Sequence, residues 1–132
     1  MKANINFSEI NQLLGRKGIK ATLSSGYQTN SFRVYYPLKI LFIKKDVSVT
    51  IKLKGYSATV INWEFSLNGL GSLENKAKKV IKKKLPSFIT LVNDKELKVD
   101  VGNIQALKKA GIRVKINNLV INDSGFIADL NI

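Results

Sequence analysis

The side chains that most often carry catalysis are scarce in this sequence. None of its 132 residues is histidine or cysteine, which removes the commonest general base, the usual nucleophilic triads and classical zinc sites. The nine acidic residues are scattered, and the densest group is Asp94, Glu96 and Asp100. Strand-like alternation places these three and Lys98 on one exposed face, which favours a solvated surface over an acid/base pair or a metal site. We therefore expect no enzymatic activity, no metal site and no cofactor.

Two loops contain residues typical of ligand-binding motifs. Residues 68–72 precede a predicted helix as a phosphate-binding loop would, but they lack the Gly-Lys-Ser/Thr ending and the parallel βαβ setting of such loops. A backbone anion site at the N-terminus of that helix stays open. Residues 122–125 are of the residue types found in calcium-binding loops, but they lack the full series of ligands. A hairpin turn is therefore predicted there.

Positive charge is the most unusual property of the sequence. Lysine and arginine number 22 against 9 acidic residues, and the formal net charge is +13. Such an excess raises the local concentration of anionic partners, whether nucleic acid, anionic lipid headgroups or acidic proteins. A lysine-rich surface that serves only solubility, in a compositionally biased sequence, explains the same numbers equally well.

Many of the lysines fall within a predicted helix over residues 72–85, which begins with Ser72 as N-cap and ends before Pro86. At 14 residues this helix would be about 21 Å long. Its apolar face consists of Leu73, Ala77, Val80, Ile81 and Leu85, at helical spacing. Lysines on its other faces and on a second, shorter helix are the candidates for contact with an anion or a membrane: Lys76, Lys79, Lys82, Lys83, Lys108 and Lys109.

The rest of the sequence is mostly strand-like. Apolar and polar residues alternate over residues 32–42, 47–53 and 61–67, which predicts an antiparallel meander that leads into the 72–85 helix. The turn of its first hairpin is expected at residues 44–46. Pro37 favours an edge position, a bulge or a break. Changes in parity predict β-bulges near Val60 and at residues 117–118.

Together these elements predict one α+β domain over residues 1–132. A curved antiparallel β-sheet, made of the meander and a C-terminal hairpin, packs around one main amphipathic helix. Two short helices complete it, one capped by Ser8 and one by Asn103. The candidates to line a ligand cavity in this interior are Trp63, Phe65, Val80 and Ile81, with ordinary core packing as the alternative for Trp63.

The order of these elements resembles that of the TULIP (tubular lipid-binding) superfamily. The resemblance rests on residues 5–14 (INFSEINQLL), residues 68–70 (NGL) at the entry to the main helix, and residues 119–130 (LVINDSGFIADL). The last segment is similar to the closing hairpin of small bacterial members. The resemblance implies a highly twisted antiparallel sheet wrapped around a long helix, with lipid held between them.

These observations favour a non-enzymatic binding module for a lipid or another apolar ligand, with a basic surface that favours anionic membranes. Two alternatives stay open. One is an interaction or assembly scaffold with a protein partner or as a homo-oligomer. The other is nucleic-acid binding through the lysine-rich face, which the scarcity of arginine disfavours.

Targeting signals are not evident in the sequence. No apolar run approaches the length of a transmembrane helix, and the N-terminus lacks the apolar core of a signal peptide. The chain is therefore expected in the cytoplasm, unless a targeting segment lies outside it.

Overall fold

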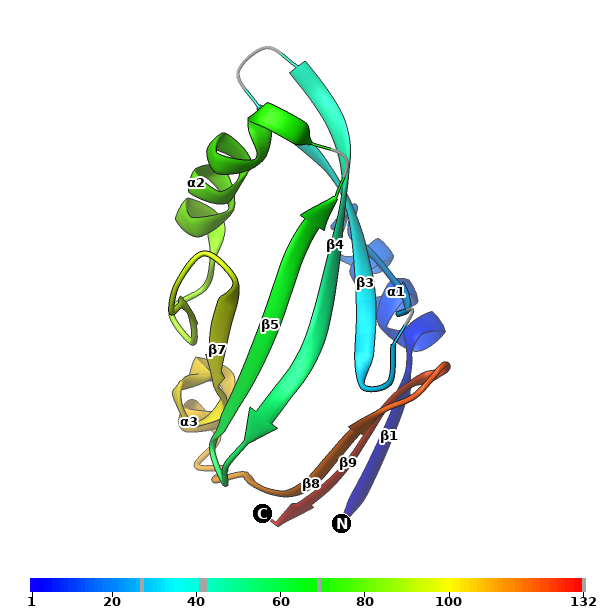
Figure 1. Cartoon of the computed structure of the whole chain (residues 1–132). Coiled ribbons are helices and arrows are strands. Elements are labelled where there is room, and N and C mark those ends of the chain that lie inside the picture. The colour runs from blue at the N-terminus through cyan, green and yellow to red at the C-terminus, as the bar shows by residue number, and fades with distance from the viewer. Residues whose placement is uncertain (27, 41–42, 69, 132) are drawn as a thin grey trace.

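The structure is a computed structural model that describes residues 1–26, 28–40, 43–68 and 70–131. Within these residues the chain forms two antiparallel β-sheets and three α-helices, and the larger sheet is curved without closing into a barrel (Figure 1). The predicted α+β fold class is confirmed.

The larger sheet contains the meander. Its strand order is β2 (Thr22–Ser25), β3 (Ser31–Ile40), β4 (Ile43–Tyr56), β5 (Val60–Asn68), β7 (Glu96–Asp100) and β6 (Ile89–Leu91). The smaller sheet has the order β1 (Lys2–Asn6), β9 (Gly125–Asn131) and β8 (Lys115–Ile121). The helices are α1 (Phe7–Arg16), α2 (Glu74–Lys84) and α3 (Gln105–Lys109), and the 3-10 turns Gly71–Leu73 and Val101–Asn103 precede α2 and α3.

Pro37 lies at an edge of the larger sheet. Strand β2 pairs with β3 only as far as Tyr35, so at Pro37 the strand has a neighbour on one side only, where it pairs with Asp46 of β4. A residue without a backbone N–H is tolerated at such a position. Of the three alternatives predicted for this proline, an edge position, a bulge or a break, the structure shows the edge position.

Two predictions about the meander are wrong. Residues 44–46 lie within β4, because Lys39 already pairs with Lys44, and residues 41–42 of this hairpin fall outside the described part of the chain. Within the described residues 43–68, no bulge lies near Val60. The apolar residues change parity there because β4 ends at Tyr56 and a new strand, β5, begins at Val60 after the turn. The register shift lies instead in β4, between Leu53 and Gly55.

The second bulge prediction is confirmed. The pairing of β8 with β9 shifts register between Ile116 and Asn118, so Asn117 is the extra residue. The hairpin turn over residues 122–125 is also confirmed, since Oδ1 of Asn122 accepts hydrogen bonds from the amides of Ser124 and Gly125, each at 2.9 Å.

The predicted N-caps are wrong. Helix α1 is capped by Asn6, whose Oδ1 accepts a hydrogen bond of 2.7 Å from the amide of Glu9, and Ser8 lies inside the helix. Ser72 lies in the 3-10 turn before α2, and that helix has no side-chain cap within the described residues. Helix α3 begins after Ile104, and the Asn103 side chain instead donates a hydrogen bond to Asp100.

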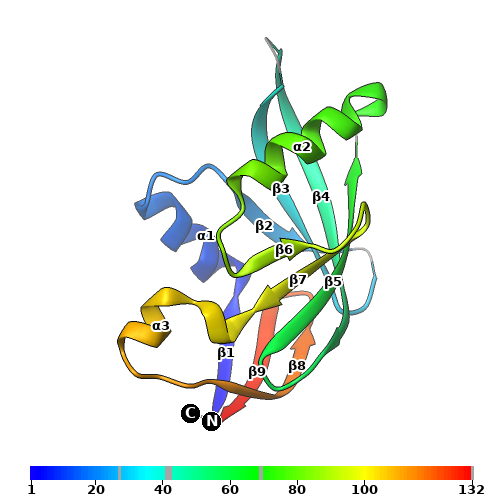
Figure 2. The same cartoon turned by 90° about the vertical axis from the view of Figure 1, so that its left-hand side faces the viewer.

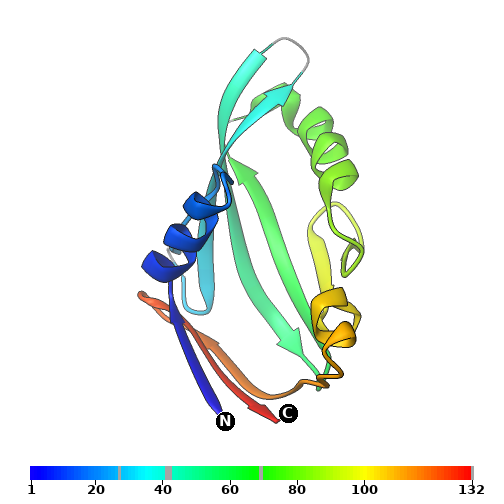
Figure 3. The same cartoon turned by 180° about the vertical axis from the view of Figure 1, so that it is seen from behind.

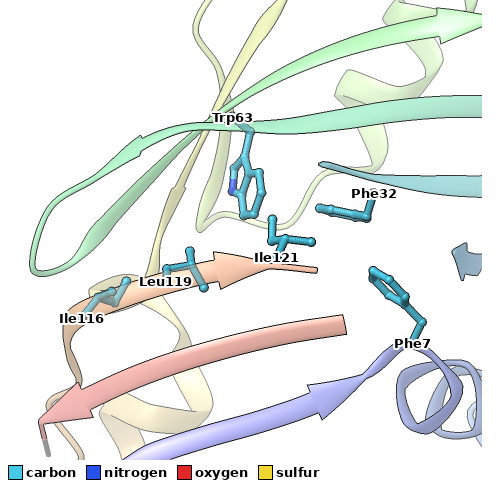
Figure 4. Close-up of a cluster of buried hydrophobic side chains, with 6 residues drawn as sticks. All are labelled: Phe7, Phe32, Trp63, Ile116, Leu119 and Ile121. Carbon is cyan, nitrogen blue, oxygen red and sulfur yellow. The ribbon is translucent and has the colours of Figure 1, made fainter. Parts of the chain in front are cut away.

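The buried core has two clusters at opposite ends of the larger sheet. One lies between the two sheets, where residues from α1, β3, β5 and β8 meet: Phe7, Phe32, Trp63, Ile116, Leu119 and Ile121 (Figure 4). The other lies beneath α2 and contains Leu38, Val47, Leu67, Leu70 and Ala77. Helices α2 and α3 lie on one side of the molecule (Figure 2), and α1 lies at the opposite margin (Figure 3).

Candidate functional site

A cavity of about 540 Å³ lies between the two core clusters, bounded by the larger sheet, the end of α2 and strand β6. It includes residues from both clusters, such as Phe32 and Trp63 from one and Leu38 and Leu67 from the other. Phe126 of β9 closes it on the side of the smaller sheet. The cavity therefore follows the inner face of the larger sheet from one core cluster to the other.

The floor of the cavity follows directly from the alternation in the sequence. The register places Val34 opposite Val49, Val49 opposite Leu67 and Ile51 opposite Phe65. Because alternate residues of a strand share a face, these rows form one apolar surface across β3, β4 and β5.

The same surface continues into the two remaining strands. Trp63 of β5 lies opposite Leu97 of β7, and in β6 Ile89 and Leu91 pair with Val99 and Leu97. All five of these residues line the cavity, on the same face of the sheet as Phe65.

The cavity exists because α2 is too short to cover this face. Helix α2 has 11 residues and is about 16 Å long, whereas β4 has 14 residues and extends over about 46 Å. The helix packs Ala77 against one end of the face, where Leu38 and Val47 are buried. The middle of the face, around Val49 and Phe65, is left to line the cavity.

Three of the four predicted cavity residues line it. Trp63, Phe65 and Ile81 do so, whereas Val80 does not. Both Val80 and Ile81 pack against the core cluster beneath α2. Trp63 serves both of its predicted roles, since it is only 7% exposed and its ring meets that of Phe32 edge to face at 5.5 Å.

One charged side chain, that of Lys84, is among the described residues that line the cavity. Lys84 is the last residue of α2 and is exposed. Its Nζ lies 6.0 Å from the centre of the Tyr36 ring, a cation–π distance, and Tyr36 also lines the cavity. The sequence had indicated only that Lys84 belongs to a lysine-rich helix. Its place at the cavity depends on the packing of α2 against β3.

Comparison of the chain with protein-family models, curated proteins and solved structures found no match. What the cavity binds therefore has to be inferred from its own residues.

The six predicted anion-contact lysines are all exposed, four on α2 and two on α3: Lys76, Lys79, Lys82, Lys83, Lys108 and Lys109. Both helices lie on the same side of the molecule, with β6 and β7 between them (Figure 2). We call these six residues the basic surface. Lys108 also donates a hydrogen bond of 3.2 Å to Oδ1 of Asn103.

Two further hollows, of about 430 and 560 Å³, adjoin the basic surface. One, beside α2, is lined in part by Lys78, Lys79, Lys82 and Asp94. The other, beside α3, is lined in part by Lys108, Arg113 and Lys115. Cations thus gather on this side of the molecule beyond the six predicted residues.

Two of the acidic residues in the Asp94–Asp100 segment make structural contacts. Glu96 accepts a hydrogen bond from Lys54, and this contact holds the pKa of the Glu96 carboxyl below its ordinary value. Asp100 accepts hydrogen bonds from the Gly102 amide at 3.0 Å and from Asn103 Nδ2 at 2.9 Å. In the described residues, no group of three or more acidic side chains is placed to hold a metal ion. Residue 69 of the predicted anion loop lies outside the described part of the chain.

Proposed function

We propose that this chain is a non-enzymatic binding module that holds a lipid acyl chain or another apolar ligand in the cavity beside α2. The observation that supports this proposal is the composition of the cavity lining. It consists mainly of aliphatic and aromatic side chains from one face of the sheet, with no acidic residue among the described ones. The volume of about 540 Å³ falls within the roughly 300–1,000 Å³ of typical ligand sites. An apolar guest would gain about 25 cal/mol for each Å² of apolar surface removed from water.

The resemblance to the TULIP superfamily supports the same proposal, because it implies lipid held between a twisted antiparallel sheet and a helix. Here the space lies beyond the end of a short helix, where the sheet is longer than the element that covers it.

The basic surface favours contact with anionic membranes through charge. Each cation near such a surface contributes about 1 kcal/mol. Insertion of α2 is disfavoured, because its apolar residues Ala77, Val80 and Ile81 already pack against the sheet. None of the helices in the described residues has the length and apolarity that crossing a membrane would require.

Ligand binding is tested by extracting the purified protein with organic solvent and analysing the extract by mass spectrometry. Binding of added ligand is followed by quenching of Trp63, the only tryptophan of the chain, with a stearic acid brominated in mid-chain. We expect co-purified lipid or saturable quenching. The absence of both co-purified lipid and saturable quenching would overturn the proposal.

A pair of variants locates the binding. Val49→Phe fills the centre of the cavity floor, whereas Ser66→Phe adds the same ring to an exposed position of β5. We expect Val49→Phe to abolish saturable quenching and Ser66→Phe to preserve it. Equal effects of the two variants would show that the ligand binds elsewhere.

Membrane contact is tested by flotation with vesicles of phosphatidylglycerol and phosphatidylcholine at low salt. Reversing two charges of the basic surface, Lys79→Glu with Lys83→Glu, is expected to weaken binding about tenfold or more. The matched control, Lys17→Glu with Lys20→Glu, changes net charge equally near α1 at the opposite margin. Equal weakening would mean that net charge, and not the basic surface, determines binding.

A further inference from the structure

We propose that the ligand of the cavity is a single-chain amphiphile with a long-chain carboxylate, and that Lys84 binds its headgroup. This inference rests on the proposed function, because it requires the cavity to hold an acyl chain.

Lys84 is the one charged residue among the described residues that line the cavity. The other described lining residues are uncharged, so a carboxylate at this place meets a cation and no competing acid. None of the ion pairs in the described part of the chain includes Lys84. Its contact with the Tyr36 ring places the ammonium group beside the apolar lining, within reach of a headgroup whose chain enters the cavity.

The dipole of α2 opposes an anion here, since Lys84 lies at the C-terminal end of the helix. That end carries the equivalent of about half a negative charge. The last turn, however, contains three full positive charges, those of Lys82, Lys83 and Lys84. The lysines therefore outweigh the dipole, and the local field favours an anion.

The volume of the cavity favours one acyl chain over two. A methylene group needs about the volume of a water molecule in the liquid, roughly 30 Å³. A cavity of about 540 Å³ is therefore on the scale of one long fatty chain of about eighteen such groups. A lipid with two long chains would need about twice this volume.

The test compares a charged with an uncharged form of one chain. The probes are a dibrominated stearic acid and the corresponding dibrominated alcohol, with quenching of Trp63 as the readout. The variant Lys84→Met removes the charge and keeps an apolar stem of similar length. The matched control is Lys20→Met, which removes an exposed lysine that lies outside both the cavity lining and the basic surface.

We expect the wild type to bind the acid about fivefold more tightly than the alcohol at low salt, as for a partly exposed ion pair. Lys84→Met should bind both probes with the affinity of the alcohol, and Lys20→Met should behave as the wild type. Raising the salt concentration should weaken binding of the acid alone.

Three outcomes would overturn the inference and leave the proposed function standing. They are equal affinities of the wild type for acid and alcohol, equal weakening of both probes in Lys84→Met, and equal effects of Lys20→Met and Lys84→Met. Tighter binding of a brominated diacyl phosphatidylglycerol than of the acid would overturn the single-chain assignment. If neither acid nor alcohol quenches Trp63, the proposed function fails together with the inference.

Discussion

The rings of Phe32 and Phe126 lie 5.1 Å apart at an interplanar angle of 74°. This edge-to-face contact joins β3 of the larger sheet to β9 of the smaller one. Both rings also line the cavity, and Phe126 meets the ring of Phe7 from α1 at 5.5 Å. The contact that connects the two sheets therefore also closes one end of the cavity.

Removing the Phe126 ring should destabilise the whole fold. We expect Phe126→Ala to lower the free energy of unfolding by about 3–5 kcal/mol, the usual cost of emptying a large core position. Urea denaturation measures the change. Val120→Ala in β8, where the side chain is 37% exposed, should change stability by less than about 0.5 kcal/mol. A loss in Phe126→Ala as small as that of the control would mean that the ring does not connect the sheets.

Gly125 should be intolerant of any side chain. A Cβ at this position would lie 2.2 Å from the carbonyl oxygen of Ile5 and 2.5 Å from Cα of Asn6, both backbone atoms of the paired strand β1. We expect Gly125→Ala to lower the free energy of unfolding by at least about 1–3 kcal/mol. Gly55→Ala is the control, because a Cβ there has no atom within 4 Å. Similar unfolding midpoints in urea for the two variants would contradict the close approach of β1 to β9.

The cap of α1 can be assigned with two conservative variants. Asn6→Ala removes the acceptor for the Glu9 amide and should cost about 1 kcal/mol. Ser8→Ala removes an exposed hydroxyl inside the first turn and should change stability by less than half as much. Thermal unfolding followed by circular dichroism compares them. A larger loss in Ser8→Ala would show that the serine is the cap.

The sequence predicted the meander because each strand has one buried face. Alternation marks such strands locally, and the pairing of Val49 with both Val34 and Leu67 follows once the strands are antiparallel. Strand β1 escaped prediction for the opposite reason. Its Ile5 is 46% exposed, so no alternation marks it, and the strand exists through pairing with β9 at the other end of the chain.

The sequence predicted the wrong N-cap for α1 and one wrong cavity residue, because both features depend on contacts between residues far apart in the sequence. Asn6 and Ser8 are both good N-cap residues, and pairing with Gly125 in β1–β9 holds Asn6 in the extended conformation that a cap needs. Similarly, the sequence placed Val80 and Ile81 on one apolar face. Both residues pack against the core cluster beneath α2, and only the packing of the helix on the sheet decides that Ile81 also lines the cavity.

The ion pair between Lys54 of β4 and Glu96 of β7 should give the protein a defined dependence on pH. The hydrogen bond between the two side chains lowers the pKa of Glu96 below its ordinary value of 4.5, and the same bond raises the pKa of Lys54 above 10.5. Because the pKa of Glu96 is depressed, its contribution to stability is fully present above the unfolded value and is lost as pH falls through the folded value. Because the pKa of Lys54 is raised, its contribution is fully present below 10.5 and is lost as pH rises through the folded value.

Titration of the Glu96 carboxyl by NMR checks this expectation. In the wild type it should titrate below the ordinary range for a glutamate, and Lys54→Met should return it toward 4.5, because the hydrogen bond is the largest cause of the shift. Lys52→Met is the matched control, since Lys52 lies two residues away on β4 and pairs with Glu64. It should leave the titration of Glu96 nearly unchanged. An ordinary titration of Glu96 in the wild type, or an equal change in both variants, would mean that Lys54 and Glu96 are not hydrogen-bonded in solution.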